Sequence, residues 1–441
     1  MSLIFIKISA THKLEKMKFS KYNILISSSK KTDIVYNSLS DKFIFLKKGR
    51  WENCITNINT QCYEKLRRGG FIVDDNVDET QMYIENARKI ENDVTCTHLI
   101  INPTINCNLN CWYCYEKHIP SKMSQRTIGN VKKLIEKSCE SSKELMISFF
   151  GGEPFLCYEN VMLPILQYAK KKSLKNNVHF VSNCTTNGSL INSKRIKELR
   201  SLNFNFAQIT LDGNRDSHDK TRCFAGGKGT YDLILKNLKE LARNQIHVTL
   251  RINYTQDNIN SIAKIPSDLN DMTFEEKKYI DVSFHKVWQE NECNNDDLIG
   301  AINSFKKIGF VASKFLLGPF CYGDLRNSSI INYNGDVYKC TAVNFHDALR
   351  DGYLNSNGEI KWENDSLEKR MAAKFSNKPC LECKIMPICH GGCSSKPLER
   401  GRNYCIFDFD EGKKTEAVMT KLLFNIHYKW KDVFSGFYRK K

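Results

Sequence analysis

The sequence predicts an α/β fold in which a parallel sheet is flanked by two smaller regions. Between residues 97 and 285, six short apolar runs alternate with helix-like segments, as parallel strands with crossover helices require. Strand-like runs with many lysines precede this region, and a segment with seven patterned cysteines follows it. The 441 residues are enough for two or three domains, and the 41% apolar content supports a proper core.

The elements of the central region can be placed in order. Strands are expected where apolar and β-branched residues cluster, and helices where apolar residues recur every three to four positions. The predicted strands cover residues 97–102, 144–150, 178–184, 205–211, 246–253 and 279–285. The predicted helices cover residues 128–139, 159–171, 193–202 and 231–244.

The N-terminal region is predicted to contain three short strands and a helix. The strand-like runs are 22–27, 32–37 and 42–46, and a helical pattern extends from about 50 to 67. Glycines at 69 and 70 then end the helix and begin another extended piece. Residues 1–70 hold 14 Lys or Arg against 5 Asp or Glu, so this region is basic.

Three cysteines directly after the first central strand carry the strongest chemical signal. Cys107, Cys111 and Cys114 have the spacing C-x3-C-x2-C. Three thiolates in one loop can hold three irons of a cubane [4Fe-4S] cluster, and the fourth iron stays free to bind a substrate or cofactor. The spacing also fits one face of an amphipathic helix. A loop is favoured, because Pro103 ends the preceding strand and Asn108 is a turn residue.

With three further motifs, these cysteines make the chain resemble the radical SAM superfamily. Residues 149–154 contain Gly-Gly-Glu-Pro, 185–188 read Thr-Thr-Asn-Gly, and 209–213 read Ile-Thr-Leu-Asp-Gly, each at the end of a predicted strand. The resemblance implies a partial (β/α)6 TIM-like barrel with its active site at the carboxyl ends of the strands. It also implies that the open iron binds S-adenosylmethionine, which releases a 5′-deoxyadenosyl radical that abstracts a substrate hydrogen.

The resemblance also implies which residues meet the cofactor. The aromatic residue before the third cysteine, Tyr113, is expected near the adenine. The backbone of the Gly-Gly-Glu-Pro motif is expected to meet the methionine amino group, where a side chain would block the approach. The predicted cofactor-binding residues are Tyr113, Gly151, Gly152, Glu153, Pro154, Thr186 and Asn187. No catalytic residue is assigned beyond the cluster ligands.

Seven further cysteines between residues 321 and 405 form a second pattern. Without a family, the pattern could form a pair of zinc sites, because C-x2-C knuckles such as Cys380 and Cys383 are a zinc signature. The whole pattern, with Gly335 before Cys340, resembles the SPASM domain of radical SAM enzymes that modify peptides and proteins. By that resemblance one auxiliary [4Fe-4S] cluster is held by Cys380, Cys383, Cys389 and Cys405, and another by Cys321, Cys340 and Cys393.

The second of these clusters lacks a fourth cysteine. The family often supplies it just upstream of the first ligand, but segment 314–320 has none, and the nearest upstream candidate is Cys293. We therefore expect an open iron, which could bind a substrate thiolate and favour a thioether product. A cluster closed by another group would instead serve as an electron relay.

The strand and helix order of the N-terminal region resembles the winged-helix module that binds leader peptides in enzymes maturing ribosomal peptides. A basic face suits an acidic leader, although it is also compatible with an ordinary solvated surface. The predicted domains are a winged-helix-like peptide-recognition domain (1–95), a radical SAM core (96–315), a SPASM domain (316–412) and a C-terminal helix (413–441).

The predicted function is that of a radical SAM/SPASM peptide maturase with three [4Fe-4S] clusters and S-adenosylmethionine. It would crosslink or oxidise a precursor peptide with a leader, using a reductant such as flavodoxin or ferredoxin. One alternative is an anaerobic sulfatase-maturating enzyme, whose family carries a basic aspartate after the cysteine equivalent to Cys340. Here Thr341 follows, and threonine is no base near neutral pH. Another alternative is a non-enzymatic iron–sulfur or zinc scaffold that binds peptides.

Composition points to the cytoplasm. Eighteen cysteines in an intracellular chain argue for metal chemistry over disulfides. No apolar stretch approaches the length that spans a bilayer, so no membrane partner is expected. The net charge of +17 would suit nucleic acid, but the chain has no visible RNA-binding motif.

Overall fold

The computed structural model describes residues 17–27, 31–51, 60–290, 295–313, 320–401 and 404–422. The chain forms two compact units. The first unit consists of residues 1–89, 374–393 and 400–441, and the second of residues 90–373 and 394–399. The segment predicted as a SPASM domain, 316–412, is thus divided between the two units.

The second unit is built on parallel strands that follow one another in sequence. The strands are β6 (Cys96–Ile101), β7 (Glu144–Phe149), β8 (His179–Thr186), β9 (Phe204–Leu211), β10 (His247–Tyr254) and β11 (Ile280–Lys286). All six predicted strands are confirmed, and each observed end lies within two residues of the predicted end. The α/β fold and the partial barrel expected from the sequence are therefore present.

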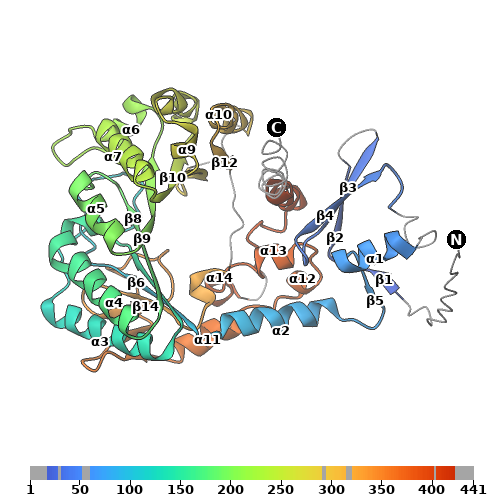
Figure 1. Cartoon of the computed structure of the whole chain (residues 1–441), viewed down its shortest axis with the longest axis horizontal. Coiled ribbons are helices and arrows are strands. Elements are labelled where there is room, and N and C mark those ends of the chain that lie inside the picture. Colours follow the sequence, from blue (N-terminus) through green and yellow to red (C-terminus); the bar gives the residue numbers. More distant parts are fainter. Residues whose placement is uncertain are drawn as a thin grey trace, which may run out of the picture. The chain divides into compact units, whose positions relative to one another are not determined.

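Helices cover the outer face of this sheet, as Figure 1 shows for α3, α4, α5 and α7. The four predicted helices correspond to α3 (Gln125–Ser141), α4 (Leu163–Lys175), α5 (Ser193–Ser201) and α7 (Tyr231–Arg243). Other helical elements were not predicted: η1 (Pro154–Cys157), η2 (Tyr158–Met162), α6 (Arg215–Thr221), α8 (Ile259–Ile262), η3 (Ile265–Leu269), α9 (Phe274–Lys277), α10 (Asn295–Lys307), η4 (Tyr322–Asp324), α11 (Ser366–Ala372) and α14 (Ser395–Arg400). The core lies between helices and sheet, where Ile147, Ile209 and Leu250 are fully buried.

The sheet continues beyond the six predicted strands on both sides. The short strand β12 (Val311–Ser313) extends it parallel to β11. On the other side β13 (Ser328–Ile331) runs parallel to β6, with Ser328 opposite His98. An antiparallel series then follows, formed by β14 (Asp336–Tyr338), β15 (Gly352–Leu354) and β16 (Ile360–Trp362).

The first unit contains a three-stranded antiparallel sheet in the order β2-β3-β4. The predicted strands are found as β2 (Asn23–Ser27), β3 (Thr32–Asn37) and β4 (Lys42–Lys47). The predicted helix is α1 (Thr60–Gly69); residues 52–59 of the prediction lie outside the described residues, and residues 50 and 51 are not helical. The predicted extended piece is β5 (Ile72–Asp74), which pairs with β1 (Met17–Phe19). The long helix α2 (Glu79–Glu91) was not predicted.

The cysteine-rich segment of the first unit contacts the N-terminal region directly. It contains α12 (Lys378–Leu381), α13 (Met386–Cys389) and a helix over 411–422. Lys21 Nζ donates a 2.8 Å hydrogen bond to the carbonyl oxygen of Leu381, and Ser38 Oγ donates one to the carbonyl oxygen of Lys384. The sheet and the cysteine-rich segment therefore fold as one body.

The predicted C-terminal helix is described only in part. Residues 411–422 are helical, and Val418 and Leu422 are buried as the apolar pattern predicts. The rest of the predicted helix, residues 423–441, lies outside the described residues. Within the part of the chain that the structure describes, no helix combines the length and the apolar character needed to cross a membrane.

Candidate functional site

A cavity of about 580 Å³ opens at the carboxyl ends of the parallel strands in the second unit. Cys107, Cys111 and Cys114 all line it, and they lie in an irregular loop after β6. The alternative that they form one face of a helix is therefore wrong. Five of the predicted cofactor-binding residues also line the cavity, namely Tyr113, Gly151, Gly152, Thr186 and Asn187.

The chemistry of these thiols fits a metal cluster. Burial raises the pKa of Cys107 to about 12 and that of Cys114 to about 11, so both stay protonated at neutral pH unless a metal takes the place of the proton. The backbone N–H of Leu109 donates to Cys107 Sγ over 3.5 Å, and Asn187 Nδ2 donates to the same sulfur over 3.9 Å. Such N–H···S contacts help to hold iron–sulfur clusters and to set their potential.

No three His, Cys, Asp or Glu side chains converge on the position of a single metal ion anywhere in the described ranges. A cubane cluster makes a different demand, since it takes one thiolate for each iron and spreads its ligands over its corners. The three cysteines of the loop meet that demand by lining one cavity from three positions.

The two glycines after β7 are required by the approach of two backbone segments. A Cβ atom at Gly152 would lie 2.1 Å from the carbonyl oxygen of Asn106, in the cysteine loop. At Gly151 a Cβ would lie 2.8 Å from the Asn102 side chain. Both glycines have positive φ, +82° for Gly151 and +50° for Gly152. The sequence predicted glycine here to admit a cofactor; the structure adds that glycine admits the cysteine loop itself.

Glu153 joins the loop after β7 to the loop after β8. Its fully buried carboxylate accepts hydrogen bonds from Thr186 Oγ1 (2.8 Å), from the backbone N–H of Asn187 (2.7 Å) and from that of Phe155 (3.0 Å). Burial raises the pKa of Glu153, and these bonds oppose the shift. Glu153 and Pro154 are not among the residues that line the cavity. In this structure Glu153 fixes the loop after β8 against the loop after β7.

Tyr113 is held by a buried polar network that the sequence did not predict. Its hydroxyl donates to Asp212 Oδ2 at 2.7 Å and accepts from Arg222 (2.9 Å) and from Asn253 Nδ2 (2.9 Å). The Arg222 guanidinium lies 3.8 Å from Asp212, and both side chains are almost fully buried. The network fixes the cysteine loop against β9 and β10. Asp212 stood in a recognised motif, but nothing in the sequence linked it to Tyr113.

Further cavity residues come from the strands themselves. Arg251 on β10, His98 on β6 and Lys286 on β11 line the cavity, as do Trp288 and Tyr322. His98 Nε2 shares a 2.7 Å hydrogen bond with Ser148 Oγ, and burial lowers the pKa of His98 to about 4. The sequence signal that could have found these strand residues is the alternation of polar and apolar residues along each strand, because every second side chain of a strand lies on the inner face.

Residues 101–265, which include the cysteine loop and the loops after β7, β8 and β9, match the family model of the Radical SAM superfamily. The chain therefore contains a radical SAM domain over these residues, and it is an enzyme.

Two enzymes with named activities are similar to about two thirds of this chain. A cysteine-type anaerobic sulfatase-maturating enzyme of Clostridium novyi is 24% identical over 330 residues, which are 67% of this chain and 87% of that enzyme. Fe-coproporphyrin III synthase of Methanosarcina barkeri is 29% identical over 342 residues, 66% of this chain and 82% of that enzyme. One solved structure with the same fold is that of native anSMEcpe with bound AdoMet and Cp18Cys peptide, at a TM-score of 0.53. Its sequence is 17% identical, and the match covers 78% of this chain and 100% of that one.

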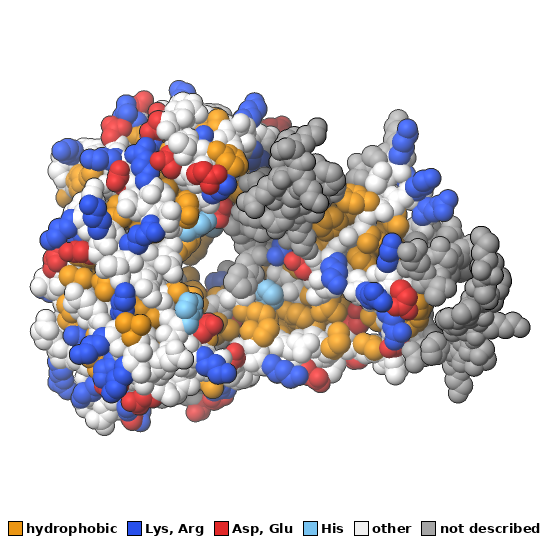
Figure 2. Space-filling model, in the orientation of Figure 1, with side chains coloured by type: hydrophobic (Ala, Val, Ile, Leu, Met, Phe, Trp, Pro, Cys, Tyr) orange, Lys and Arg blue, Asp and Glu red, His pale blue; other side chains and the backbone are white. Residues whose placement is uncertain are grey.

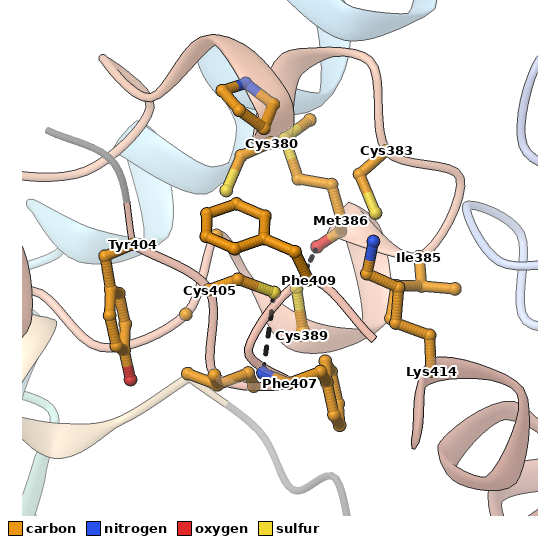
Figure 3. A pocket seen from close by; sticks show the side chains of 14 residues that line it. Cys380, Cys383, Ile385, Met386, Cys389, Tyr404, Cys405, Phe407, Phe409 and Lys414 are labelled. Atoms are coloured by element: carbon orange, nitrogen blue, oxygen red, sulfur yellow. Dashed lines mark hydrogen bonds between the residues drawn. The ribbon is translucent and has the colours of Figure 1, made fainter. Parts of the chain in front are cut away.

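The first unit of this radical SAM enzyme contains a second group of cysteines. Figure 3 shows four thiols around one small pocket, and the side chains of Phe409 and Lys414 reach into the same space. The four are the residues predicted to share one auxiliary cluster, Cys380, Cys383, Cys389 and Cys405. Burial raises the pKa of Cys389 to about 12. Asn377 Nδ2 donates to Cys380 Sγ at 3.2 Å and to the carbonyl oxygen of Tyr404 at 2.6 Å.

The other auxiliary ligands are distributed differently. Cys321 and Cys340 belong to the second unit and Cys393 to the first, so their common cluster stays a prediction. Cys340 Sγ accepts from the backbone N–H of Ala342 at 3.4 Å. Cys293, the possible fourth ligand, and segment 314–319 lie outside the described residues. Each of the described cysteines has a free thiol.

Proposed function

We propose that this radical SAM enzyme modifies a ribosomally made precursor peptide. The observation that carries the proposal is the cavity at the strand ends, which brings the cysteine loop, the glycine loop and the polar inner face of the sheet together. About 580 Å³ is within the usual range for cofactor and small-molecule sites, roughly 300–1,000 Å³. The polar side chains on the inner face of the sheet could bind a substrate next to the cofactor.

Within the cavity, Cys107, Cys111 and Cys114 would hold a [4Fe-4S] cluster. The backbone of Gly151 and Gly152 would meet the methionine end of S-adenosylmethionine. Tyr113, Thr186 and Asn187 would complete the cofactor site. When bound, S-adenosylmethionine supplies the radical that removes a hydrogen atom from the substrate. Glu153 and the network around Tyr113 hold the three loops in register, which keeps cofactor and substrate at a fixed separation.

The remaining cysteines would hold two auxiliary clusters. Cys380, Cys383, Cys389 and Cys405 already line one pocket, which supports the first of these. Cys321, Cys340 and Cys393 would hold the second, with one iron open to a substrate thiolate. Closing a crosslink after hydrogen abstraction releases one electron and one proton, and these clusters would take the electron. A product that lacks two hydrogens, such as a thioether, carbon–carbon or carbon–oxygen crosslink, balances this scheme.

Known proteins support a polypeptide substrate. The Clostridium novyi relative is named for maturing sulfatases, and the solved anSMEcpe structure holds a peptide. The side chain that follows Cys340 argues against the sulfatase reaction itself. Thr341 Oγ1 lies 2.5 Å from the hydroxyl of Tyr322, and neither group is a base near neutral pH. We therefore expect no formylglycine from a sulfatase-derived peptide.

The N-terminal sheet offers a place for a leader peptide. In the order β2-β3-β4, strand β4 is an edge strand of the described sheet. A hollow between β4 and α1 is lined by Lys42, Phe43, Lys65 and Arg68, among others. Figure 2 shows Lys and Arg side chains gathered over α1 and the neighbouring strands. A leader could add a strand at this edge through main-chain hydrogen bonds, and acidic leader residues could pair with the three cations.

The function is tested on the full chain, reconstituted with iron and sulfide without oxygen and reduced with dithionite. We expect 5′-deoxyadenosine from S-adenosylmethionine, none from the Cys107→Ala/Cys111→Ala/Cys114→Ala variant, and loss of two hydrogens from a precursor encoded beside the gene. The mass spectrum of the precursor is the readout. Cofactor cleavage without any change in the peptide, or turnover of a porphyrin instead, would overturn the proposal.

Leader recognition is tested by charge reversal rather than by deletion, because the N-terminal sheet shares a unit with the auxiliary cysteines. The Lys42→Glu/Lys65→Glu/Arg68→Glu variant should lose precursor turnover on the order of tenfold or more and keep uncoupled cofactor cleavage. A matched control reverses three exposed lysines on the outer helices of the second unit, Lys171, Lys197 and Lys236. Equal precursor turnover by the two variants would show that Lys42, Lys65 and Arg68 do not take part in leader recognition.

A further inference from the structure

The inner face of the parallel sheet is polar where the cavity meets it. Strands of parallel sheets are usually apolar on both faces, because helices cover the sheet. Here the outward residues Cys184, Ile209 and Leu250 are fully buried against the helices. The inward residues of the same strands line the cavity and are polar, namely Asn183, Thr185, Gln208, Thr210, Arg251 and Asn253. The sheet is therefore shaped to bind a polar group.

Arg251 is the charged member of this inward set. Its Nε donates to Asn253 Oδ1 at 2.8 Å, and none of the ion pairs among the described residues includes it. The Arg251 side chain is half-buried, and burial lowers the pKa of its guanidinium. The guanidinium has five N–H groups in a planar fork. Among the described residues only one of them, Nε–H, has a hydrogen-bond partner, Asn253.

The carboxyl group that acts on Arg251 from nearby is Asp212, which is already engaged by Arg222 and by the Tyr113 hydroxyl. The other cations that line the cavity are Arg222 and Lys286, and Arg222 already faces Asp212 at 3.8 Å. The single carboxyl group of the lining, Glu116, accepts the backbone N–H of Gly152 at 2.7 Å. A cavity with three cations and one engaged carboxyl favours an anion as its occupant.

We propose that Arg251 binds a carboxylate of the substrate, an aspartate or glutamate side chain at or beside the modified residue. The inference rests on the proposed function and deepens it by naming a substrate class. A carboxylate would form two parallel N–H···O bonds with the guanidinium fork. It would also give the half-buried guanidinium an ion-pair partner within the cavity.

The cofactor and a peptide C-terminus also carry carboxylates, so the source has to be separated. The residues expected to bind S-adenosylmethionine lie on the loops after β6, β7 and β8. Strand β9 lies between β8 and β10, and neighbouring strands are about 4.8 Å apart, so β10 lies about 10 Å from β8. Arg251 is thus on a strand that supplies none of the expected cofactor-binding residues, although its partner Asn253 also donates to the Tyr113 hydroxyl.

Three capped or uncapped pentapeptides serve as probes. The first is Ac-Ala-Gly-Glu-Gly-Ala-NH2, the second has Gln in place of Glu, and the third has Gln and a free C-terminal carboxylate. Their binding to the reconstituted full chain is measured by equilibrium dialysis with isotope-labelled peptide, together with the dissociation constant of S-adenosylmethionine. The variants are Arg251→Met, Arg251→Lys and a matched control on the same strand, Thr249→Val, which does not line the cavity. Cofactor cleavage and melting midpoints are recorded for each preparation.

We expect the wild type to bind the Glu peptide about tenfold or more tightly than the Gln peptide, the worth of a charge-assisted pair. Arg251→Met should abolish this difference, Arg251→Lys should keep part of it, and Thr249→Val all of it. The cofactor's dissociation constant should change less than about threefold. Equal binding of the Glu and Gln peptides by the wild type would overturn the inference without any variant, while intact cofactor cleavage would leave the proposed function standing. Preference for the free C-terminus, or cofactor binding that weakens tenfold in Arg251→Met, would assign the arginine to another carboxylate.

Discussion

Gly152 shows how a single residue supports the site. Its φ is positive, and a Cβ at this position would lie only 2.1 Å from the Asn106 carbonyl oxygen, so there is room for hydrogen alone. The cysteine loop can therefore approach the loop after β7 only because the side chain is absent. The glycine is needed even before a cofactor binds.

We expect Gly152→Ala to lower the free energy of unfolding by at least about 1–3 kcal/mol, because backbone strain adds to the clash. The displaced loop should also fail to retain its cluster, with a loss of about four irons per chain. Iron analysis and denaturant unfolding measure the two effects. The control is Gly226→Ala, where a Cβ would meet no heavy atom within 4 Å and φ is not positive. Full iron content in Gly152→Ala would contradict the steric argument.

The second prediction concerns the Tyr113 hydroxyl. Removing it in Tyr113→Phe leaves Asp212, Arg222 and Asn253 short of a buried partner, which costs about 1–3 kcal/mol of stability. Denaturant midpoints of the cluster-free protein measure this cost. The control Tyr168→Phe also removes a hydroxyl that donates to a carboxylate, Glu136, at a half-exposed site. Equal losses in the two variants would show that burial of the network is unimportant.

At the scale of elements, β6 to β11 were predictable because each is a compact apolar run between turn signals. The strands β12 to β16 were missed, since most have three or four residues and none stands out from its neighbours. The resemblance to the SPASM pattern grouped Cys380, Cys383, Cys389 and Cys405, and they do line one pocket. The network around Tyr113 was beyond sequence reasoning, because Asp212 and Arg222 are 99 and 109 residues away along the chain.

Strand β6 carries a prediction about acid stability through His98. Burial lowers the pKa of His98 in the folded protein to about 4, with a smaller effect from the charge of Lys339, whereas an unfolded histidine titrates near 6.5. The unfolded state then binds one more proton between these values. Stability should therefore fall as the pH drops from about 6.5 to 4, by up to about 3 kcal/mol for this side chain.

The His98→Asn variant should remove about one proton from the slope of unfolding free energy against pH in this window. Urea unfolding of the cluster-free chain at several pH values provides the slope. The unfolding free energy of the wild type should change more steeply with pH than that of the variant. Part of the pH dependence should remain in the variant, because burial also lowers the pKa of His285 to about 4. Identical slopes in wild type and variant would mean that the folded protein does not lower the pKa of His98.

At the scale of the molecule, the cysteine loop and the four-cysteine pocket belong to different units. Loss of one set should therefore leave the other set loaded. We expect about 12 irons per chain in the wild type. The triple alanine variant of Cys107, Cys111 and Cys114 should lose about four, and so should the quadruple alanine variant of the pocket. Iron and sulfide analysis with electron paramagnetic resonance distinguishes this from collapse of all sites together, which would contradict separate units.

The first unit joins two stretches of chain that the ribosome makes far apart in time. About 280 residues separate the N-terminal part of this unit from the segment that begins at Lys374. At roughly 5–20 residues per second, the sheet emerges about 15–60 s before that segment. During this interval the hydrogen bonds from Lys21 and Ser38 to the segment have no acceptors. A cluster held by Cys380, Cys383, Cys389 and Cys405 could therefore form only after this late segment has been made, whereas the cysteine loop of the second unit is made well before it.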